Sequence, residues 1–275
     1  MRTGLIKNIT TGVCIALISP AILAADGKTT LQYEHNFKTM DRRHSDSYKL
    51  IHKTKSLWQY ELKFSSSAGG GKTYDVAYDD MQGGSGGIVI QKDLKFSGDK
   101  KSTLTPSFEV SYGSSSVGYQ PGLKYSYTIN KEWSVYGRYR YEVKKQSRSS
   151  RYKTVSSSDA YGHEGEKYLS KSDTGRHRID TGFSWNGIPN LSLGYVFNLY
   201  IGDNLNDSWT YSKGQYTQNR YAAYNGRKTD YEHQFKVQYK YKQWQPYLEV
   251  DDVAVSATSK SRQGKIKLGI KYQFK

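Results

Sequence analysis

Ten consecutive residues near the C-terminus alternate between basic or polar and apolar side chains without a break. From Lys265 to Phe274, isoleucine, leucine, tyrosine or phenylalanine occupies every second position, and lysine, glycine or glutamine occupies the others. A period of two is typical of a β-strand with one apolar and one polar face. In a water-soluble domain the apolar face packs on a core, whereas in an outer-membrane barrel it faces lipid while the polar face lines a watery lumen. This strand therefore restricts the fold to a water-soluble β domain or an outer-membrane β-barrel.

The N-terminus has the three regions of a secretory signal peptide. Two basic residues precede an uncharged, mostly apolar run from Ile9 to Leu23, and a pair of alanines follows it. We predict that residues 1–24 are a signal peptide and that residues 25–275 form the mature barrel. Cys14 lies inside the leader and is the only cysteine. The predicted mature chain therefore has no disulfide and no cysteine metal site.

The composition favours the barrel over a soluble secreted domain. No stretch after residue 25 approaches the twenty or so apolar residues of a membrane-spanning helix. The chain has 26 tyrosines and 26 glycines but only 5 prolines, and its aromatic residues recur at alternate positions. Disordered chains are poor in aromatic residues, so disorder is excluded. The formal net charge of the full sequence is +16, and removal of the leader lowers it to +14.

Twelve segments show the same alternation, and we predict one membrane-spanning strand for each. The expected strands lie at 31–37, 48–50, 58–64, 88–96, 104–112, 117–129, 133–143, 179–185, 191–201, 231–241, 244–250 and 266–274. A thirteenth stretch, Tyr74 to Tyr78, is short and lies between glycine clusters. We assign it to a loop because bacterial barrels have an even number of strands. The predicted fold is an all-β transmembrane antiparallel β-barrel of 12 strands.

The links between these segments alternate in length. Short turns are expected at 54–57, 97–103, 130–132, 186–190 and 242–243. Longer polar links are expected at 38–45, 66–87, 145–175, 202–229 and 253–264, with one short exception at 113–116. Short periplasmic turns and long extracellular loops are typical of outer-membrane barrels. Aromatic residues near strand ends are expected in the interfacial girdles, namely Trp58, Trp133, Trp185, Trp244 and Phe274.

The inward-facing residues predict a positively charged lumen. With the apolar faces set outward, inward arginines and lysines outnumber inward acids. These basic residues include Arg138, Arg140, Arg176, Arg178, Lys124, Lys144, Lys236 and Lys267. Rings of such cations select anions, and alternate positions along a strand stand roughly 6.6 Å apart, which suits a linear polymer with one carboxylate per sugar. In a second interpretation these cations pair with lumen acids, Arg140 with Asp180 for example, and rigidify the barrel.

Other function classes have weaker support in the residues. A hydrolase barrel would draw on Asp79 with Asp80, on Asp251 with Asp252, or on Asp230 with His233. The first pair lies in a glycine-rich loop, and His233 falls on the lipid-facing register. The sequence has no serine in a nucleophile-elbow pattern and no metal-ligand spacing of its histidines, so we expect no enzyme, metal or cofactor. An adhesin or lipopolysaccharide-binding barrel would use the basic loop at 145–175.

Nucleic-acid binding is the usual interpretation of a basic chain, and here it is excluded. The predicted leader directs the chain away from DNA. The basic residues also alternate with lipid-type residues, whereas nucleic-acid-binding proteins cluster them on one solvated face.

Four stretches resemble the oligogalacturonate-specific porins of Gram-negative bacteria. They are SVGYQPGLKYSY at 116–127, RYRYE at 138–142, RHRIDTG at 176–182 and PYLEVDDVAVSATSKSRQGKIKLGIKYQF at 246–274. The resemblance extends over essentially the whole mature chain. It implies a monomeric, twelve-stranded channel of the outer membrane that passes acidic oligosaccharides from pectin breakdown into the periplasm along inward basic residues.

The resemblance also implies residues and partners. Arg138, Arg140, Arg176 and Arg178 match its motifs and are expected on the basic track. The family includes a sialic-acid-inducible relative, so another acidic sugar such as sialic acid is the alternative substrate. Further expected partners are outer-membrane lipid, lipopolysaccharide and, through the C-terminal strand, the barrel assembly machinery.

Overall fold

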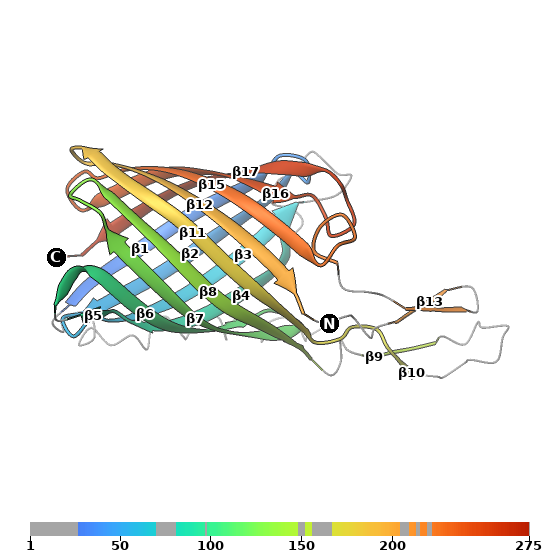
Figure 1. Ribbon diagram of the computed structural model, residues 1–275. Helices are drawn as coiled ribbons and strands as arrows, with labels where there is room; N and C mark the ends of the chain where they lie inside the picture. Colours follow the sequence, from blue (N-terminus) through green and yellow to red (C-terminus); the bar gives the residue numbers. More distant parts are fainter. Residues whose placement is uncertain are drawn as a thin grey trace, which may run out of the picture.

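A single antiparallel sheet closes on itself as a barrel in the computed structural model (Figure 1). The structure describes residues 27–69, 81–96, 98–147, 152–155, 167–203, 209–212, 215–218 and 222–274. The expected signal peptide at 1–24 and the stretch from Tyr74 to Tyr78 lie outside these residues. Within the described ranges, no helix is long and apolar enough to cross a membrane.

Consecutive spanning strands are hydrogen-bonded neighbours, and the last spanning strand pairs with the first. The strands are β1 (Gly27–Lys38), β2 (Arg43–Thr54), β3 (Trp58–Gly69), β4 (Met81–Lys92) with its continuation β5 (Leu94–Phe96), β6 (Asp99–Tyr112), β7 (Ser116–Thr128), β8 (Trp133–Gln146), β11 (Thr174–Ile188), β12 (Leu191–Gly202), β15 (Thr229–Tyr239), β16 (Trp244–Ala254) and β17 (Arg262–Gln273). β17 pairs with β1 from Tyr272 opposite Leu31 to Lys265 opposite Lys38. The predicted closed barrel of 12 antiparallel strands is confirmed.

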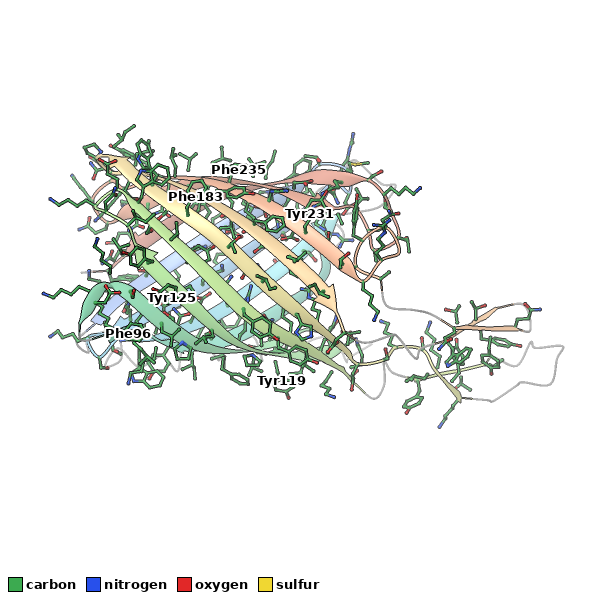
Figure 2. The ribbon with its side chains drawn as sticks, in the orientation of Figure 1. Phe96, Tyr119, Tyr125, Phe183, Tyr231 and Phe235 are labelled. Carbon is green, nitrogen blue, oxygen red and sulfur yellow. The ribbon has the colours of Figure 1, made fainter. Side chains whose placement is uncertain are left out.

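The outer face of the barrel carries the apolar half of each alternating strand. Figure 2 shows Phe96, Tyr119, Phe183 and Phe235 on this face, pointing away from the barrel. Phe235 is 59% exposed, as expected for a side chain that faces lipid and not a protein core. A strand of 12 residues is about 40 Å long, and a tilt of about 40° leaves about 30 Å along the barrel axis, enough to cross the apolar band.

Tryptophans of the wall gather at the end of the barrel that has the short turns. Trp58, Trp133 and Trp244 each begin a strand after such a turn, and Trp185 lies opposite Trp133 in the β8–β11 ladder with ring centroids 6.3 Å apart. This is the arrangement expected of one interfacial girdle, because an amphipathic indole is most stable where lipid meets water.

Several expected loops are shorter than predicted because strands continue beyond the apolar band. The link expected at 38–45 is only the turn at 39–42, and β3 and β4 reduce the link expected at 66–87 to residues 70–80. The added stretches carry serine, glycine and histidine, which have no apolar period although their backbones remain paired. The turn expected at 97–103 is also too long, since β6 begins at Asp99.

Two expected loops contain hairpins that the alternation did not predict. β9 (Tyr152–Thr154) pairs with β10 (Lys167–Leu169) inside 145–175, and β13 (Trp209–Ser212) pairs with β14 (Gln215–Gln218) inside 202–229. Both hairpins lie at the barrel end opposite the short turns (Figure 1). The ring of Tyr168 contacts those of Tyr211 and Tyr216, so the two hairpins touch one another.

Asp93 interrupts the strand predicted at 88–96. β4 ends at Lys92 and β5 begins at Leu94, and the Asp93 side chain accepts hydrogen bonds from Lys53 at 2.5 Å and Thr105 at 2.8 Å. These bonds hold the carboxylate inside the barrel, which explains why a strand break is tolerated here.

Candidate functional site in the barrel lumen

Asp180 is the centre of an arginine cluster on the inner wall of β8 and β11. Its side chain is 0% exposed, and its two carboxylate oxygens accept hydrogen bonds from Nε of Arg138 and Nε of Arg178, both at 2.6 Å. Nη2 of Arg140 lies 3.4 Å from the same carboxylate. One anion thus holds three cations, and the expected pairing of Arg140 with Asp180 is confirmed.

Glu142 and Glu109 extend this cluster in two directions. Arg176 donates from Nε to Glu142 at 2.6 Å, and Nη1 of Arg178 lies 3.8 Å from the same carboxylate. Glu109 on β6 lies 3.9 Å from Arg140 and 3.1 Å from Lys63 on β3. The guanidiniums are therefore fixed in place by acids from neighbouring strands, and these acids also offset part of their charge.

Tyr200 and Asn198 on β12 support the same guanidiniums and were not predicted from the sequence. The guanidinium carbons of Arg176 and Arg178 lie 4.5 and 4.9 Å from the Tyr200 ring centroid. Asn198 accepts a hydrogen bond from Arg178 Nη2 at 3.0 Å. Both side chains occupy inward positions of β12, so the period of two was the available signal, hidden by the apolar appearance of the strand.

A lysine cluster forms a second charged region on β15, β16 and β17. Lys236 donates to Glu249 at 3.1 Å, and Lys267 donates to the other oxygen of that carboxylate. Lys267 and Lys265 each lie 2.8 Å from Asp251, which is 1% exposed. Ammonium and carboxylate groups alternate along this wall, so its lysines are ion-paired in the same way as the arginines.

Tyr247 on β16 lies against the inner wall next to β17 and β1. Its hydroxyl donates to Glu34 at 2.5 Å and accepts from Gln32 at 2.8 Å. The ring crosses Gly269 so closely that a Cβ at residue 269 would lie 2.1 Å from Cζ of the tyrosine. Glycine at 269 therefore allows the ring to lie against the strand and keeps the lumen open.

Some lysines of the inner wall have no carboxylate partner in the described part of the chain. Lys271 is one of them, and its ammonium donates to Oε1 of Gln238 at 3.0 Å. Among the residues the structure describes, Lys49, Lys124 and Lys144 have no carboxylate within 4.0 Å. The register places them on the inner face, since Lys49 pairs with Lys63 in the β2–β3 ladder, Lys124 pairs with Arg138 in the β7–β8 ladder, and Lys144 pairs with Thr174 in the β8–β11 ladder.

Comparison with known sequences decides the family. The sequence model of the oligogalacturonate-specific porin (KdgM) family matches residues 21–171 and 177–274. The chain belongs to the oligogalacturonate-specific porin family. This porin is thus a β-barrel of the bacterial outer membrane, as predicted.

Individual relatives are distant but match over nearly their whole length. The oligogalacturonate-specific porin KdgM of Dickeya dadantii is 25% identical over 273 residues, which cover 98% of this chain and 99% of that protein. The protein YiiY of Salmonella typhimurium is 24% identical over 260 residues, or 94% and 96% of the two chains. Among solved structures, the NanC porin has a TM-score of 0.61 at 16% identity over 88% of this chain and 98% of that one, and the fold is therefore shared.

A solved complex belongs to the same set of structural relatives. The KdgM porin in complex with disordered oligogalacturonate has a TM-score of 0.58 at 17% identity, and the match covers 90% of this chain and 99% of that one. It supports the barrel architecture of this porin independently of the NanC comparison.

The porin brings some of the predicted track residues together and separates others. Arg138, Arg140, Arg176 and Arg178 form the single cluster around Asp180 and Glu142. Of the predicted lysines, Lys236 and Lys267 share Glu249, Lys124 is a ladder neighbour of Arg138, and Lys144 lies near the end of β8. Their role as a substrate track stays a prediction.

The acids and the histidine of the hydrolase alternative are dispersed. Asp251 lies in the lysine cluster, 2.8 Å from Lys265 and Lys267, and Asp252 accepts a hydrogen bond from Arg262 at 2.6 Å. Asp79 and Asp80 are outside the described residues. Nδ1 of His233 lies 2.8 Å from the hydroxyl of Tyr195, in the outward register with Phe197, and Asp230 is 3.3 Å from Arg262.

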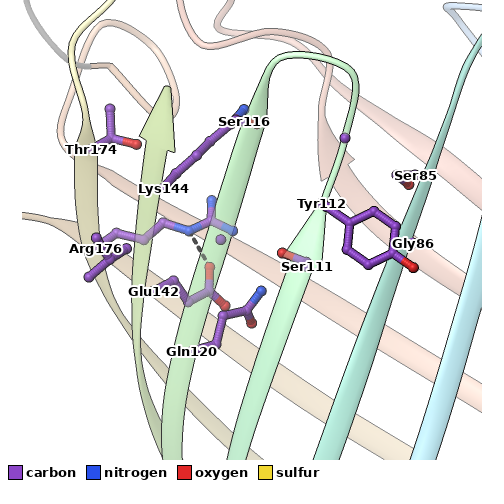
Figure 3. A pocket seen from close by; sticks show the side chains of 13 residues that line it. Ser85, Gly86, Ser111, Tyr112, Ser116, Gln120, Glu142, Lys144, Thr174 and Arg176 are labelled. Carbon is purple, nitrogen blue, oxygen red and sulfur yellow. Dashed lines mark hydrogen bonds and ion pairs between the residues drawn. The ribbon is translucent and has the colours of Figure 1, made fainter. Parts of the chain in front are cut away.

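A hollow of about 500 Å³ opens on the inner face near the long-loop end, between β4, β6, β7, β8 and β11 (Figure 3). Its wall is mostly small or neutral polar, with three charged side chains. The lining residues are Ser85, Gly86, Ser111, Tyr112, Gly113, Ser116, Gly118, Gln120, Glu142, Val143, Lys144, Thr174 and Arg176.

Proposed function

We propose that this porin is an anion-selective channel that takes up acidic oligosaccharides, specifically oligogalacturonates, into the periplasm. The observation that carries the proposal is the unequal pairing of lumen charges. Every inward acid in the set below already has a cation or a tyrosine hydroxyl as its partner, whereas Lys49, Lys124 and Lys144 have no carboxylate partner among the described residues. The acids are Glu34, Glu61, Asp93, Glu109, Glu142, Asp180, Glu232, Glu249 and Asp251.

This imbalance favours anions for an electrostatic reason. A paired carboxylate offers little field to a passing cation, because the neighbouring ammonium or guanidinium offsets it. An unpaired ammonium attracts an anion at full strength over about one Debye length, roughly 10 Å at 0.1 M salt. A twelve-stranded barrel has a narrow lumen, so an ion in transit stays within that distance of the wall.

The wall formed by β2, β3 and β4 supports the proposal that the substrate is a sugar. Serine side chains on the inner register of β2, β3 and β4 face the lumen. Together with Glu34 and Asn36 of β1 they line a hollow that ends at Lys265 and Lys267. Hydroxyls donate to and accept from sugar hydroxyls, while the cations hold carboxylates. Charges spread over β2, β7, β8, β11 and β17 suit an oligomer with repeated carboxylates better than a single sialic acid.

The outward apolar face and the closed sheet bear on the oligomeric state of the protein in the membrane. We infer a monomer whose outward apolar face contacts outer-membrane lipid and lipopolysaccharide. The barrel closes through the β1–β17 pairing, so it needs no second copy to complete the wall.

Electrical recording with matched sugars tests the substrate. The refolded porin is placed in a planar bilayer and trigalacturonate is added, with its methyl ester as an uncharged control of nearly the same shape. We expect transient block of the open channel by trigalacturonate, weaker block by sialic acid, and none by the ester. Equal block by the acid and the ester would refute the charge-based mechanism, and absence of conductance would favour the adhesin or hydrolase interpretation.

A further inference from the structure

The hollow near the long-loop end has one lysine that differs from every other charged group in its wall. Glu142 accepts the Nε–H of Arg176 at 2.6 Å and lies 3.8 Å from Arg178, so its charge is already matched. Lys144 is exposed and has no carboxylate within 4.0 Å among the described residues. The wall of the hollow therefore has a formal charge of +1, which one negatively charged group of a ligand would balance.

The shape of the hollow depends on residues without large side chains. Gly118 is the ladder partner of Lys144 on β7, and a Cβ at residue 118 would lie 2.5 Å from Oγ of Ser111. Ser85 on β4 and Ser111 on β6 are also small, and they extend this part of the wall toward Gly86 (Figure 3). The absence of bulk on β4, β6 and β7 leaves the space in front of the Lys144 and Arg176 side chains open.

The remaining lining groups suit a sugar ring. The hydroxyls of Ser85, Ser111, Ser116 and Thr174 and the amide of Gln120 are neutral donors and acceptors around the one net charge. A volume of about 500 Å³ lies within the range of small-ligand sites and accepts one or two sugar units. An inorganic anion would not need this many neutral hydrogen-bonding groups, whereas the hydroxyls of a sugar would.

We propose that this hollow is an entry subsite that binds one carboxylate-bearing sugar unit, with Lys144 as the group that holds the carboxylate and Gln120 and the hydroxyls as partners of the ring. The inference rests on the proposed function and adds a defined binding position to it. An acidic oligosaccharide docks its leading unit here before it moves down toward the arginine cluster. The subsite binds a hexuronate through one carboxylate and rejects the neutral sugar of the same size.

Lys144 and Lys145 provide a matched pair of variants. Lys145 is the next residue, faces outward and is paired with Asp173 at 3.1 Å. Block of single channels by digalacturonate added on the long-loop side is measured for Lys144→Gln, Lys145→Gln and Lys144→Arg. Loss of a charge-assisted contact in a water-filled site predicts about tenfold weaker block for Lys144→Gln. We expect Lys145→Gln to match the original chain and Lys144→Arg to restore most of the block.

A steric variant tests the shape without changing the charge. Gly118→Val fills the hollow, so we expect it also to weaken block by digalacturonate, and a shift in gel mobility on heating shows whether each variant has folded. Equal loss of block in Lys144→Gln and Lys145→Gln would overturn the subsite, as would full block in both Lys144→Gln and Gly118→Val. If the original chain shows neither anion preference nor block, the proposed function fails; if only the Lys144 and Gly118 variants fail to differ from it, the subsite alone fails.

Discussion

Neutralising Asp180 should increase the anion preference of the channel. Its carboxylate holds Arg138 and Arg178 at 2.6 Å and Arg140 at 3.4 Å, so Asp180→Asn leaves one further positive charge on the lumen wall. At about 5 Å from an ion in water, one charge contributes about 0.8 kcal/mol, and screening at about 0.1 M salt lowers this to about 0.5 kcal/mol. The permeability ratio of chloride to potassium should therefore rise about two- to fourfold.

The assay is the zero-current potential of the reconstituted channel in a potassium chloride gradient. Asp173→Asn is the matched control, because this acid pairs with Lys145 on the outer side of β8. The same substitution at Asp180 also removes a buried anion from among three guanidiniums, and we expect the free energy of unfolding in urea to fall by about 2–3 kcal/mol. An unchanged or smaller chloride preference in a folded Asp180→Asn channel would refute the reasoning, since passing ions would then not sense the arginine cluster.

Two further substitutions test the wall itself. Gly269→Ala forces the Tyr247 ring away from the strand, because the added Cβ would lie 2.1 Å from Cζ; we expect lower single-channel conductance, and Tyr247→Leu in the same background should recover it. Leu268→Lys places a charge on the lipid face at a side chain that is 56% exposed, and lipid-refolding titrations should show a loss of about 2–4 kcal/mol, whereas no loss would contradict the assigned outward face.

The alternation of side chains predicted the barrel well because each strand has lipid on one face and water on the other. Each strand between lipid and lumen needs apolar residues on one face, and every expected spanning strand is present. The prediction failed where the lipid ends. At 83–87 glycine and serine form strand without any apolar residue to mark it, and β9, β10, β13 and β14 extend beyond the barrel, where hairpins need no such period.

The inward direction of the arginines followed from the alternation, but most of their partners did not. β8 and β11 are separated by a link of unknown geometry at the sequence level, so their register was undetermined. The structure places Arg138 opposite Asp180 and Arg176 opposite Glu142, and it thereby turns most of the expected track into ion pairs. These registers determine which lysines have no carboxylate partner. No local sequence pattern predicts which lysines those are.

The most direct test of an anion-selective lumen is the zero-current potential of the refolded channel in a tenfold potassium chloride gradient, measured for the original chain and for a variant with Lys49, Lys124 and Lys144 all changed to glutamine. We predict chloride preference in the original chain and loss of most of it in the variant. A cation-selective original channel, or a variant with the same potential, would contradict the account.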